Sequence, residues 1–311
     1  MLENIGDTVL QKKVLAGKGA IVTGASTGLG FAIAEAFIKA GAHVVICARR
    51  EPELQAARDA LARGAQGGQI VAAEVADISL VEDVARLVTA AANTLPGIDI
   101  LVNNAGILGP IGRFEEVDWI EWVRTVEINL FGSVIMCRAV IPHMRRNGGG
   151  KIIQISGGGA TAPDPRFSAY ATAKAGIARF VETIAEELRE AGIDVNAVAP
   201  GAVLTRMNDE RIAAGPEKAG QDVWQVSLRR RDHGANDPGL CADLCVFLAS
   251  PASNGLTGKL ISAVRDDWQH LSERIETLRA SDVYTLRRIL PEDRGLAWPS
   301  PASQEPSRPR R

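Results

Sequence analysis

Two ionisable side chains, Tyr170 and Lys174, stand four positions apart in the run YATAK. On a helix this spacing places both side chains on one face. An ammonium close to a phenol favours the phenolate and lowers a tyrosine pKa that is otherwise about 10. The pair therefore predicts a general acid or base that works near neutral pH. The alternative is that both residues are ordinary surface side chains of a helix.

A glycine-rich run, TGASTGLG, occupies residues 23–30, after an apolar stretch and before an amphipathic one. Gly24 permits a tight turn, Gly28 lets the backbone approach a pyrophosphate, and Gly30 allows a helix to pack closely on a strand. The N–H groups at the start of that helix can then bind phosphates. The glycine spacing differs from that of the commonest dinucleotide fingerprint, so the run alone is weak evidence for such a site.

The elements that must position these residues are visible between residues 19 and 264, where apolar runs alternate with helical patterns. Several runs are continuous and β-branched, which is typical of strands that helices cover on both faces. This alternation predicts an α/β fold, a Rossmann-type doubly wound parallel sheet of about seven strands flanked by helices. The expected strands are residues 20–22, 44–48, 70–74, 100–103, 151–156, 194–199 and 259–263. The expected helices are residues 30–40, 51–63, 80–93, 116–144, 168–191 and 237–250.

We place this single domain at residues 17–264, with one insertion inside it and three segments outside it. Residues 203–236 lack a strand and predict a helical or flexible insertion at the C-terminal edge of the sheet, where ligands bind in such folds. We expect residues 1–16 to be a lead-in, 265–298 a C-terminal helical extension and 299–311 a disordered tail. Apolar residues at helical spacing indicate that the extension docks on another surface. These residues are Trp268, Leu271, Ile275 and Leu278.

The composition is that of an ordinary globular protein, because the 311 residues are 46% hydrophobic and carry a net charge of −2. It gives no reason to expect a nucleic acid or a membrane as a partner. The first residues are acidic where a secretory signal is basic, and no apolar segment approaches membrane-spanning length, which favours the cytoplasm. The basic run 229–231 is interpreted as a solvated loop or a salt-bridged face. The four cysteines are interpreted as buried apolar side chains, with no metal site: Cys47, Cys137, Cys241 and Cys245.

Six motifs occur in one order along the chain, and each has an ordinary explanation when taken alone. They are Thr23-Gly24-x3-Gly28-x-Gly30, Asp77, Asn103-Asn104-Ala105-Gly106, Asn129, Tyr170-x3-Lys174 and Pro200-Gly201-x3-Thr205. In this order and spacing they make the chain, over about residues 17–264, resemble the classical short-chain dehydrogenase/reductase family. The resemblance implies an oxidoreductase that interconverts an alcohol and a ketone or aldehyde by hydride transfer to or from a nicotinamide nucleotide.

The resemblance also implies roles for individual residues. Tyr170 would be the general acid or base at the substrate oxygen, and Lys174 would hold the nicotinamide ribose and lower the Tyr170 pKa. Asn129 would anchor a water that links Lys174 to solvent, although it also suits a kink in a helix. The expected nucleotide-binding residues are Thr23, Gly24, Ser26, Thr27, Gly28, Leu29, Gly30, Arg49, Arg50, Asp77, Ile78, Asn103, Ala105, Gly106, Tyr170, Lys174, Pro200, Gly201, Val203 and Thr205.

The chain departs from the family at the catalytic serine, which normally hydrogen-bonds the substrate carbonyl. The matching position is Gly157, and Ser156 comes one residue early. A one-residue shift turns a strand side chain to the opposite face, unless the glycines that follow form a bulge. Ser156 is our candidate, with Ser168 and Thr161 as less favoured substitutes. Loss of one such donor would lower the rate by about 10²–10³ without abolishing it.

Cofactor choice depends on the end of the second strand, where NAD enzymes usually carry an acid that bonds the ribose 2′-hydroxyl. Here the matching position is Ala48, and Arg49 and Arg50 follow. A guanidinium suits a 2′-phosphate, which favours NADP, with NAD still possible. Many NADP-linked relatives also carry a basic residue where Thr27 stands, so one of the two usual signals is missing. Both arginines also suit the surface of a helix start.

Two other function classes stay open beside the oxidoreductase. One is a nucleotide-binding or scaffold protein with weakened or lost catalysis, which only Gly157 supports. The other is a sugar-nucleotide epimerase or dehydratase of the extended branch, which shares Tyr-x3-Lys but differs in its glycine spacing. The resemblance further implies a small-molecule alcohol or carbonyl substrate, and a homodimer or homotetramer built on the helices that contain Asn129 and Tyr170. No residue cluster identifies the substrate.

Overall fold

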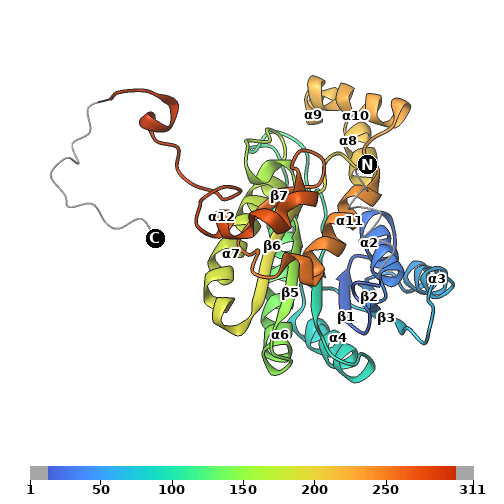
Figure 1. The fold of residues 1–311 in the computed structure, drawn as a ribbon. Coiled ribbons are helices and arrows are strands. Elements are labelled where there is room, and N and C mark those ends of the chain that lie inside the picture. Colours follow the sequence, from blue (N-terminus) through green and yellow to red (C-terminus); the bar gives the residue numbers. More distant parts are fainter. Residues whose placement is uncertain (1–12, 299–311) are drawn as a thin grey trace.

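The computed structural model describes residues 13–298 and contains one parallel sheet of seven strands (Figure 1). The strand order is β3-β2-β1-β4-β5-β6-β7. The first three strands are added toward one edge of the sheet, and β4 then pairs with β1 and begins the series that extends to the other edge. This order confirms the predicted doubly wound α/β fold. The strands are β1 (Gly19–Thr23), β2 (His43–Ala48), β3 (Val71–Val75), β4 (Ile100–Asn103), β5 (Gly150–Ile155), β6 (Ile193–Ala199) and β7 (Leu260–Ser262). The predicted tail, and residues 1–12 of the lead-in, lie outside the described residues.

Helices cover both faces of the sheet, because successive strand side chains point to opposite sides. Val22 and Ile46 belong to one apolar cluster with α2, α3 and α11. Ile21 and Val45 belong to a second cluster with α4, α6 and α7 on the other face. The helices are α2 (Gly28–Lys39), α3 (Glu51–Ala62), α4 (Val81–Thr94), α5 (Trp119–Val126), α6 (Gly132–Arg146), α7 (Ser168–Leu188) and α11 (Pro238–Ala249).

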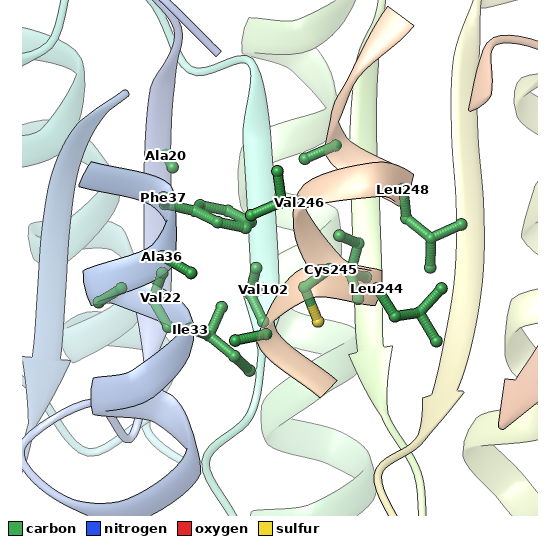
Figure 2. Packing of buried hydrophobic residues seen from close by; sticks show 14 of the residues in the cluster. Ala20, Val22, Ile33, Ala36, Phe37, Val102, Leu244, Cys245, Val246 and Leu248 are labelled. Atoms are coloured by element: carbon green, nitrogen blue, oxygen red, sulfur yellow. The ribbon is translucent and has the colours of Figure 1, made fainter. Parts of the chain in front are cut away.

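Helices α2 and α11 lie side by side on the first face of the sheet (Figure 2). Ile33 and Phe37 of α2 and Val246 of α11 are completely buried above Val102 of β4. Each such side chain stabilises the fold by roughly 1.5–3 kcal/mol. The packing fixes the start of α2 beside the end of β1. The four cysteines are all buried and unpaired, as their apolar surroundings indicated: Cys47, Cys137, Cys241 and Cys245.

The stretch predicted as one helix over residues 116–144 is interrupted by a π turn, Glu127–Phe131, between α5 and α6. The whole helical run Trp119–Arg146 has 28 residues and a mean hydropathy of 1.3 in its most apolar window, enough by length and composition to cross a membrane. The expectation that no segment approaches that length is therefore wrong. Met136 and Val140 of this run are fully buried in the second cluster, so packing against the sheet accounts for its apolar residues.

The insertion predicted at residues 203–236 is helical, and Figure 1 shows its helices standing apart from those that cover the sheet. Asn208 donates to the carbonyl of Ser227 over 3.2 Å, and both residues are buried. Trp224 Nε1 donates to the carbonyl of Ile212 over 3.1 Å. These two bonds hold the first helix of the insertion against the last. The helices are α8 (Arg206–Ala213), α9 (Gly215–Ala219) and α10 (Gln221–His233).

The C-terminal extension docks on the parent domain; its apolar spacing predicted docking but not the surface on which it docks. Trp268, Leu271 and Leu278 are buried in the first cluster, and Ile275 packs against them. The Trp268 ring lies 6.1 Å from that of Phe247 on α11. Helical structure is limited to a 3-10 segment (Trp268–Arg274), α12 (Ile275–Arg279) and a 3-10 turn (Pro291–Arg294).

The extension also covers the outer edge of β7. The backbone N–H of Leu260 donates to the carbonyl of Tyr284 over 2.8 Å. The ammonium of Lys259 donates to the carbonyls of Ser281 and Val283 over 2.8 and 3.0 Å. These bonds fix the segment after α12 along the last strand of the sheet.

Candidate active site

The glycine turn joins β1 to α2 at the carboxyl edge of the sheet. Gly24 and Gly28 have φ angles of +64° and +61°, which L side chains rarely adopt. A Cβ on Gly24 would lie 2.7 Å from the Ala105 backbone, and one on Gly30 would lie 2.5 Å from the Gly24 carbonyl oxygen. A Cβ on Gly28 would meet only the Thr205 methyl, at 4.0 Å. Gly28 therefore presents open backbone at the start of a helix, which suits a phosphate.

A cleft of about 1870 Å³ runs along this edge of the sheet, larger than the 300–1,000 Å³ or so of common ligand sites. The glycine turn and the loops after β4, β5 and β6 line one part of it, and α8 and α10 line another. Its size and the Gly28 backbone fit a dinucleotide together with a small substrate. Most of the predicted nucleotide-binding residues line it: Gly24, Ser26, Thr27, Gly28, Leu29, Gly30, Arg49, Arg50, Asp77, Ile78, Ala105, Gly106, Tyr170, Lys174, Pro200, Gly201, Val203 and Thr205.

Thr23 and Asn103 lie behind the cleft and hold its wall. The Thr23 hydroxyl accepts hydrogen bonds from the backbone N–H groups of Asn104 and Ala105, each over 3.0 Å. Asn103 Nδ2 donates to the Ser133 carbonyl over 3.1 Å, and its buried Oδ1 has no hydrogen-bond partner within residues 13–298. Both residues therefore position the ends of β1 and β4 rather than line the site.

Tyr170 and Lys174 are buried together on α7, with exposed fractions of 8% and 5%. The alternative that they are surface side chains is therefore excluded. The Lys174 ammonium lies 5.5 Å from the centre of the Tyr170 ring and donates to the Ile155 carbonyl over 2.7 Å. Burial lowers the pKa of Lys174 to about 8.

The pKa of Tyr170 moves in the direction opposite to the expected one. Burial raises it, the positive charge of Arg211 lowers it less, and the carboxylate of Asp164 adds to the rise. The Lys174 ammonium is directed to the Ile155 carbonyl, so desolvation is the dominant effect on the phenol. The neutral phenol, a proton donor, is the stable form of Tyr170 at neutral pH.

Asn129 lies in the π turn, behind the cleft, and its side chain is fully engaged. Its Oδ1 accepts from the Ile107 N–H over 3.1 Å, and its Nδ2 donates to the carbonyls of Ile107 and Thr125 over 2.8 and 2.9 Å. A Cβ on Gly106 would lie 2.4 Å from Asn129 Oδ1 and 3.8 Å from Lys174 Nζ. The side chains of Asn129 and Lys174 thus both end close to Gly106. The water-anchoring role of Asn129 stays a prediction.

Gly157 faces the Tyr170 hydroxyl. A Cβ built on it would lie 2.6 Å from that oxygen, and the backbone there is extended, with φ −166° and ψ 173°. The N–H of Ser156 donates to the Val198 carbonyl over 2.8 Å and continues the strand pairing, so the bulge needed to turn Ser156 is not seen. The Ser156 hydroxyl is buried and makes no hydrogen bond among residues 13–298. This geometry weighs against Ser156 as the donor, a role that stays a prediction.

Arg49 and Arg50 differ in their partners. Arg50 Nη1 pairs with Glu53 Oε1 over 3.0 Å at the start of α3. Arg49 forms no ion pair within the described part of the chain and lines the cleft after Ala48. Arg49 is therefore the guanidinium available to a ligand.

Asp77 is held by several donors beside the cleft. Its Oδ1 accepts from the N–H and hydroxyl of Ser79 over 3.0 and 2.6 Å, and its Oδ2 pairs with Arg124 over 2.8 Å. Burial alone would raise the Asp77 pKa, but the Ser79 bonds and the charges of Arg124 and Arg49 outweigh it and lower the pKa. Asp77 is thus a fixed carboxylate next to Ile78, which is buried.

Sequence reasoning missed several residues at the site. Asn104 was part of a motif but had no role; its Nδ2 donates to the carbonyls of Thr23 and Gly24 over 2.9 and 3.1 Å, which fixes the glycine turn. Arg211 and Asp164 influence the Tyr170 pKa from outside the family motifs. The only signal for Arg211 was its place in the insertion at the ligand-binding edge of the sheet.

The model of the short chain dehydrogenase family matches residues 18–215, and the chain belongs to that family. Among curated relatives, human dehydrogenase/reductase SDR family member 4 is 34% identical over 248 residues, which cover 79% of this chain and 86% of the relative. Glucose 1-dehydrogenase of Gluconobacter oxydans is 34% identical over 251 residues, covering 80% and 91%. An oxidoreductase with a nicotinamide nucleotide as cofactor is therefore the class to which the chain belongs.

Solved structures agree with this assignment. A putative short-chain dehydrogenase/reductase from Burkholderia xenovorans superposes with a TM-score of 0.71 at 32% identity, covering 80% of this chain and 95% of that one. Levodione reductase superposes with a TM-score of 0.73 at 26% identity, covering 83% and 98%. The shared fold extends over nearly the whole length of both relatives.

Proposed function

We propose that the protein is an NADP(H)-dependent oxidoreductase that interconverts an alcohol and a ketone or aldehyde, with Tyr170 as the general acid or base. The observation that supports this most is the buried Tyr170–Lys174 pair beside a cleft where Gly28 presents open backbone at a helix start. A nicotinamide nucleotide in that cleft would supply or accept the hydride.

The protein's own residues would handle the proton. Because burial raises the Tyr170 pKa, the phenol is protonated at neutral pH and suits proton donation to a carbonyl oxygen. Lys174 would hold the ribose hydroxyls. Asn129, whose Oδ1 and Nδ2 bond the N–H and the carbonyl of Ile107, would fix the position of Gly106 beside Lys174.

The preference for NADP(H) is supported by Arg49. No acid stands at Ala48 to repel a 2′-phosphate, and Arg49 lines the cleft without an ion pair in the described chain, whereas Arg50 is engaged by Glu53. A guanidinium with free N–H groups bonds a phosphate strongly. We therefore assign the 2′-phosphate contact to Arg49.

The test is a titration of NADPH and NADH into the wild type, Arg49→Ala, Arg50→Ala and Tyr170→Phe, followed by nicotinamide fluorescence and by carbonyl reduction over a substrate panel. We expect Arg49→Ala to weaken NADPH but not NADH, Arg50→Ala to change little, and Tyr170→Phe to bind nucleotide without turnover. Turnover that survives Tyr170→Phe would reject the role of Tyr170. Nucleotide binding without Tyr170-dependent turnover on a broad panel would favour a protein that has lost catalysis.

We also propose a homodimer or homotetramer built on α5, the π turn and α7. Trp119, Ile120 and Phe131 leave large apolar side chains exposed on this side, and Trp119 stacks on Trp122 with ring centres 5.3 Å apart. Exposed apolar patches on a soluble protein commonly mark an interface.

A further inference from the structure

Two arginines of the insertion at residues 203–236 face the cleft without a carboxylate partner. Arg211 on α8 and Arg230 on α10 both line it, and neither forms an ion pair with any residue of the described chain. Their neighbours in sequence do: Arg206 pairs with Glu210 and Arg231 with Asp232. Arg211 and Arg230 therefore bring positive charge to the cleft that nothing nearby neutralises by direct contact.

The two guanidiniums are partly withdrawn from water and close to one another. Arg211 Nε is fully buried and has no hydrogen-bond partner in residues 13–298. Burial, and then repulsion from Arg211, lowers the pKa of Arg230. The Asn208–Ser227 bond holds α8 against α10 and keeps the two charges together. Partly buried like charges are costly unless an anion offsets them.

The arginine pair lies at the Tyr170 end of the cleft. The Arg211 guanidinium lies 5.3 Å from the centre of the Phe167 ring, and Phe167 is buried in one apolar cluster with Tyr170 and Leu108. The charge of Arg211 lowers the Tyr170 pKa, by less than burial raises it, which is consistent with a position close to the phenol. The pair is thus next to the reacting group, whereas Arg49 lies after β2, where the nucleotide's ribose phosphate is expected.

Carboxylates near the pair do not neutralise it. Asp164 is the partly buried one, and burial raises its pKa while Arg211 lowers it less, so it is a poor permanent counter-ion. Asp164 makes no ion pair or side-chain hydrogen bond with the described residues. Asp209 and Asp222 also line the cleft, but both are exposed. Met207 and Val223, which pack against the buried cluster of Phe167, add apolar side chains to the cleft wall.

We infer that the substrate carries an anionic group, a carboxylate or a phosphate, which Arg211 and Arg230 bind while Tyr170 acts on a carbonyl or alcohol in the same molecule. This inference rests on the proposed function and narrows it to anionic hydroxy or oxo compounds. Arg211 supplies planar N–H donors that suit either anion. An apolar stretch between the two groups would lie against Met207 and Val223.

The experiment compares a series of aliphatic oxo acids with the methyl ester of each, and with phosphate monoesters of hydroxyketones, as substrates with NADPH. The enzymes are the wild type, Arg211→Gln, Arg230→Gln and Arg229→Gln, the last a matched control because Arg229 is exposed on the same helix and does not line the cleft. We expect the wild type to prefer the anionic member of each pair. Each cleft variant should lose about ten- to a hundredfold in that preference, mainly through KM.

A second readout is independent of turnover. Saturated acids of the same lengths have no carbonyl to reduce, and their binding to each variant, against that of their methyl esters, is measured by calorimetry. If the saturated acids bind in an Arg211-dependent way but none of the oxo compounds is reduced, the anion site is supported and the proposed reduction is rejected. Tyr170-dependent reduction with no preference for anions, or a preference that Arg211→Gln leaves intact, would overturn the inference alone. The acid and phosphate arms decide between the two anions.

Discussion

Lys174 carries its charge inside the protein, and its pKa of about 8, against a usual 10.5, has a consequence for stability. Below about pH 8 the lysine is charged in both the folded and the unfolded chain, and the cost of burying the charge is fully present. Between about pH 8 and 10.5 the unfolded chain binds a proton that the folded protein has released. The contribution of Lys174 to the free energy of unfolding therefore becomes more favourable as pH rises through this range.

We predict that the free energy of unfolding of the wild type, minus that of Lys174→Met, increases as pH rises from about 8 to 10.5, because the variant lacks the titrating group. Urea denaturation at several pH values measures this difference. Lys218→Met, at an exposed lysine of α9, is the control. A difference that does not change with pH would mean that Lys174 is solvated.

At the catalytic serine position, Gly157→Ala and Ser156→Ala should differ. A methyl on Gly157 would lie 2.6 Å from the Tyr170 hydroxyl, so the phenol must move, and displacement of this kind lowers kcat by up to about 10²-fold. Ser156→Ala should keep kcat within about threefold, since its hydroxyl makes no bond to Tyr170. Steady-state kinetics at saturating NADPH test both. A loss of about 10²–10³ in Ser156→Ala would instead establish Ser156 as the donor.

The sequence located the position that faces Tyr170, since the spacing to Gly157 is a property of one strand and one helix. It could not locate Arg211, because that residue reaches the site from an insertion whose placement depends on side-chain bonds such as Asn208 to Ser227. It also misjudged the Tyr170 pKa. Helical spacing shows which charges are neighbours but not how deeply they are buried.

Among the elements, the π turn Glu127–Phe131 places the Asn129 side chain against Gly106 at the wall of the cleft. We predict that Gly106→Ala lowers kcat by at least about tenfold with little loss of nucleotide affinity, since its Cβ would lie 2.4 Å from Asn129 Oδ1. Gly64→Ala is the control, because its Cβ would meet only an ordinary contact at 3.5 Å. Full activity in Gly106→Ala would show that Asn129 has no positioning role.

The strands and most helices were predictable because they carry their pattern locally: continuous apolar strands and amphipathic helices of ordinary length. The break in residues 116–144 was not, since Gly132, which follows the π turn directly, is also tolerated inside a continuous helix and does not by itself mark a change of hydrogen-bond register. Asn129 was the other signal, and the sequence left open whether that residue kinked a helix or served the site. The structure places Asn129 in the turn and against Gly106.

The extension should contribute to stability through Trp268. We predict that Trp268→Ala lowers the free energy of unfolding by about 3–5 kcal/mol, because the side chain is 7% exposed and packs on Phe247. Trp298→Ala should change it by less than about 0.5 kcal/mol, since that side chain is 68% exposed. Urea denaturation measures both. Equal effects would mean that the extension does not dock in solution.

At the scale of the whole molecule, the apolar patch on α5 and the π turn predicts self-association. Ile120 and Phe131 are 74% and 53% exposed, and a charge on either should disrupt an interface there. We predict that Ile120→Asp and Phe131→Asp lower the molar mass measured by light scattering from an oligomer to a smaller species. Val81→Asp, at the exposed first turn of α4, should leave the mass unchanged. A monomeric wild type would reject the proposed assembly.

A parallel sheet has two outer strands, here β3 and β7, whose unpaired backbone groups are a template for recruiting another chain. At β7 the N–H of Leu260 already bonds the carbonyl of Tyr284, so the protein's own backbone covers that edge. Release of the segment after α12 would leave the backbone groups at the outer edge of β7 unpaired and free to bond another chain. Proteolytic clipping of the extension would therefore favour fibrillar or amorphous aggregation before it affected chemistry at Tyr170, which lies on α7.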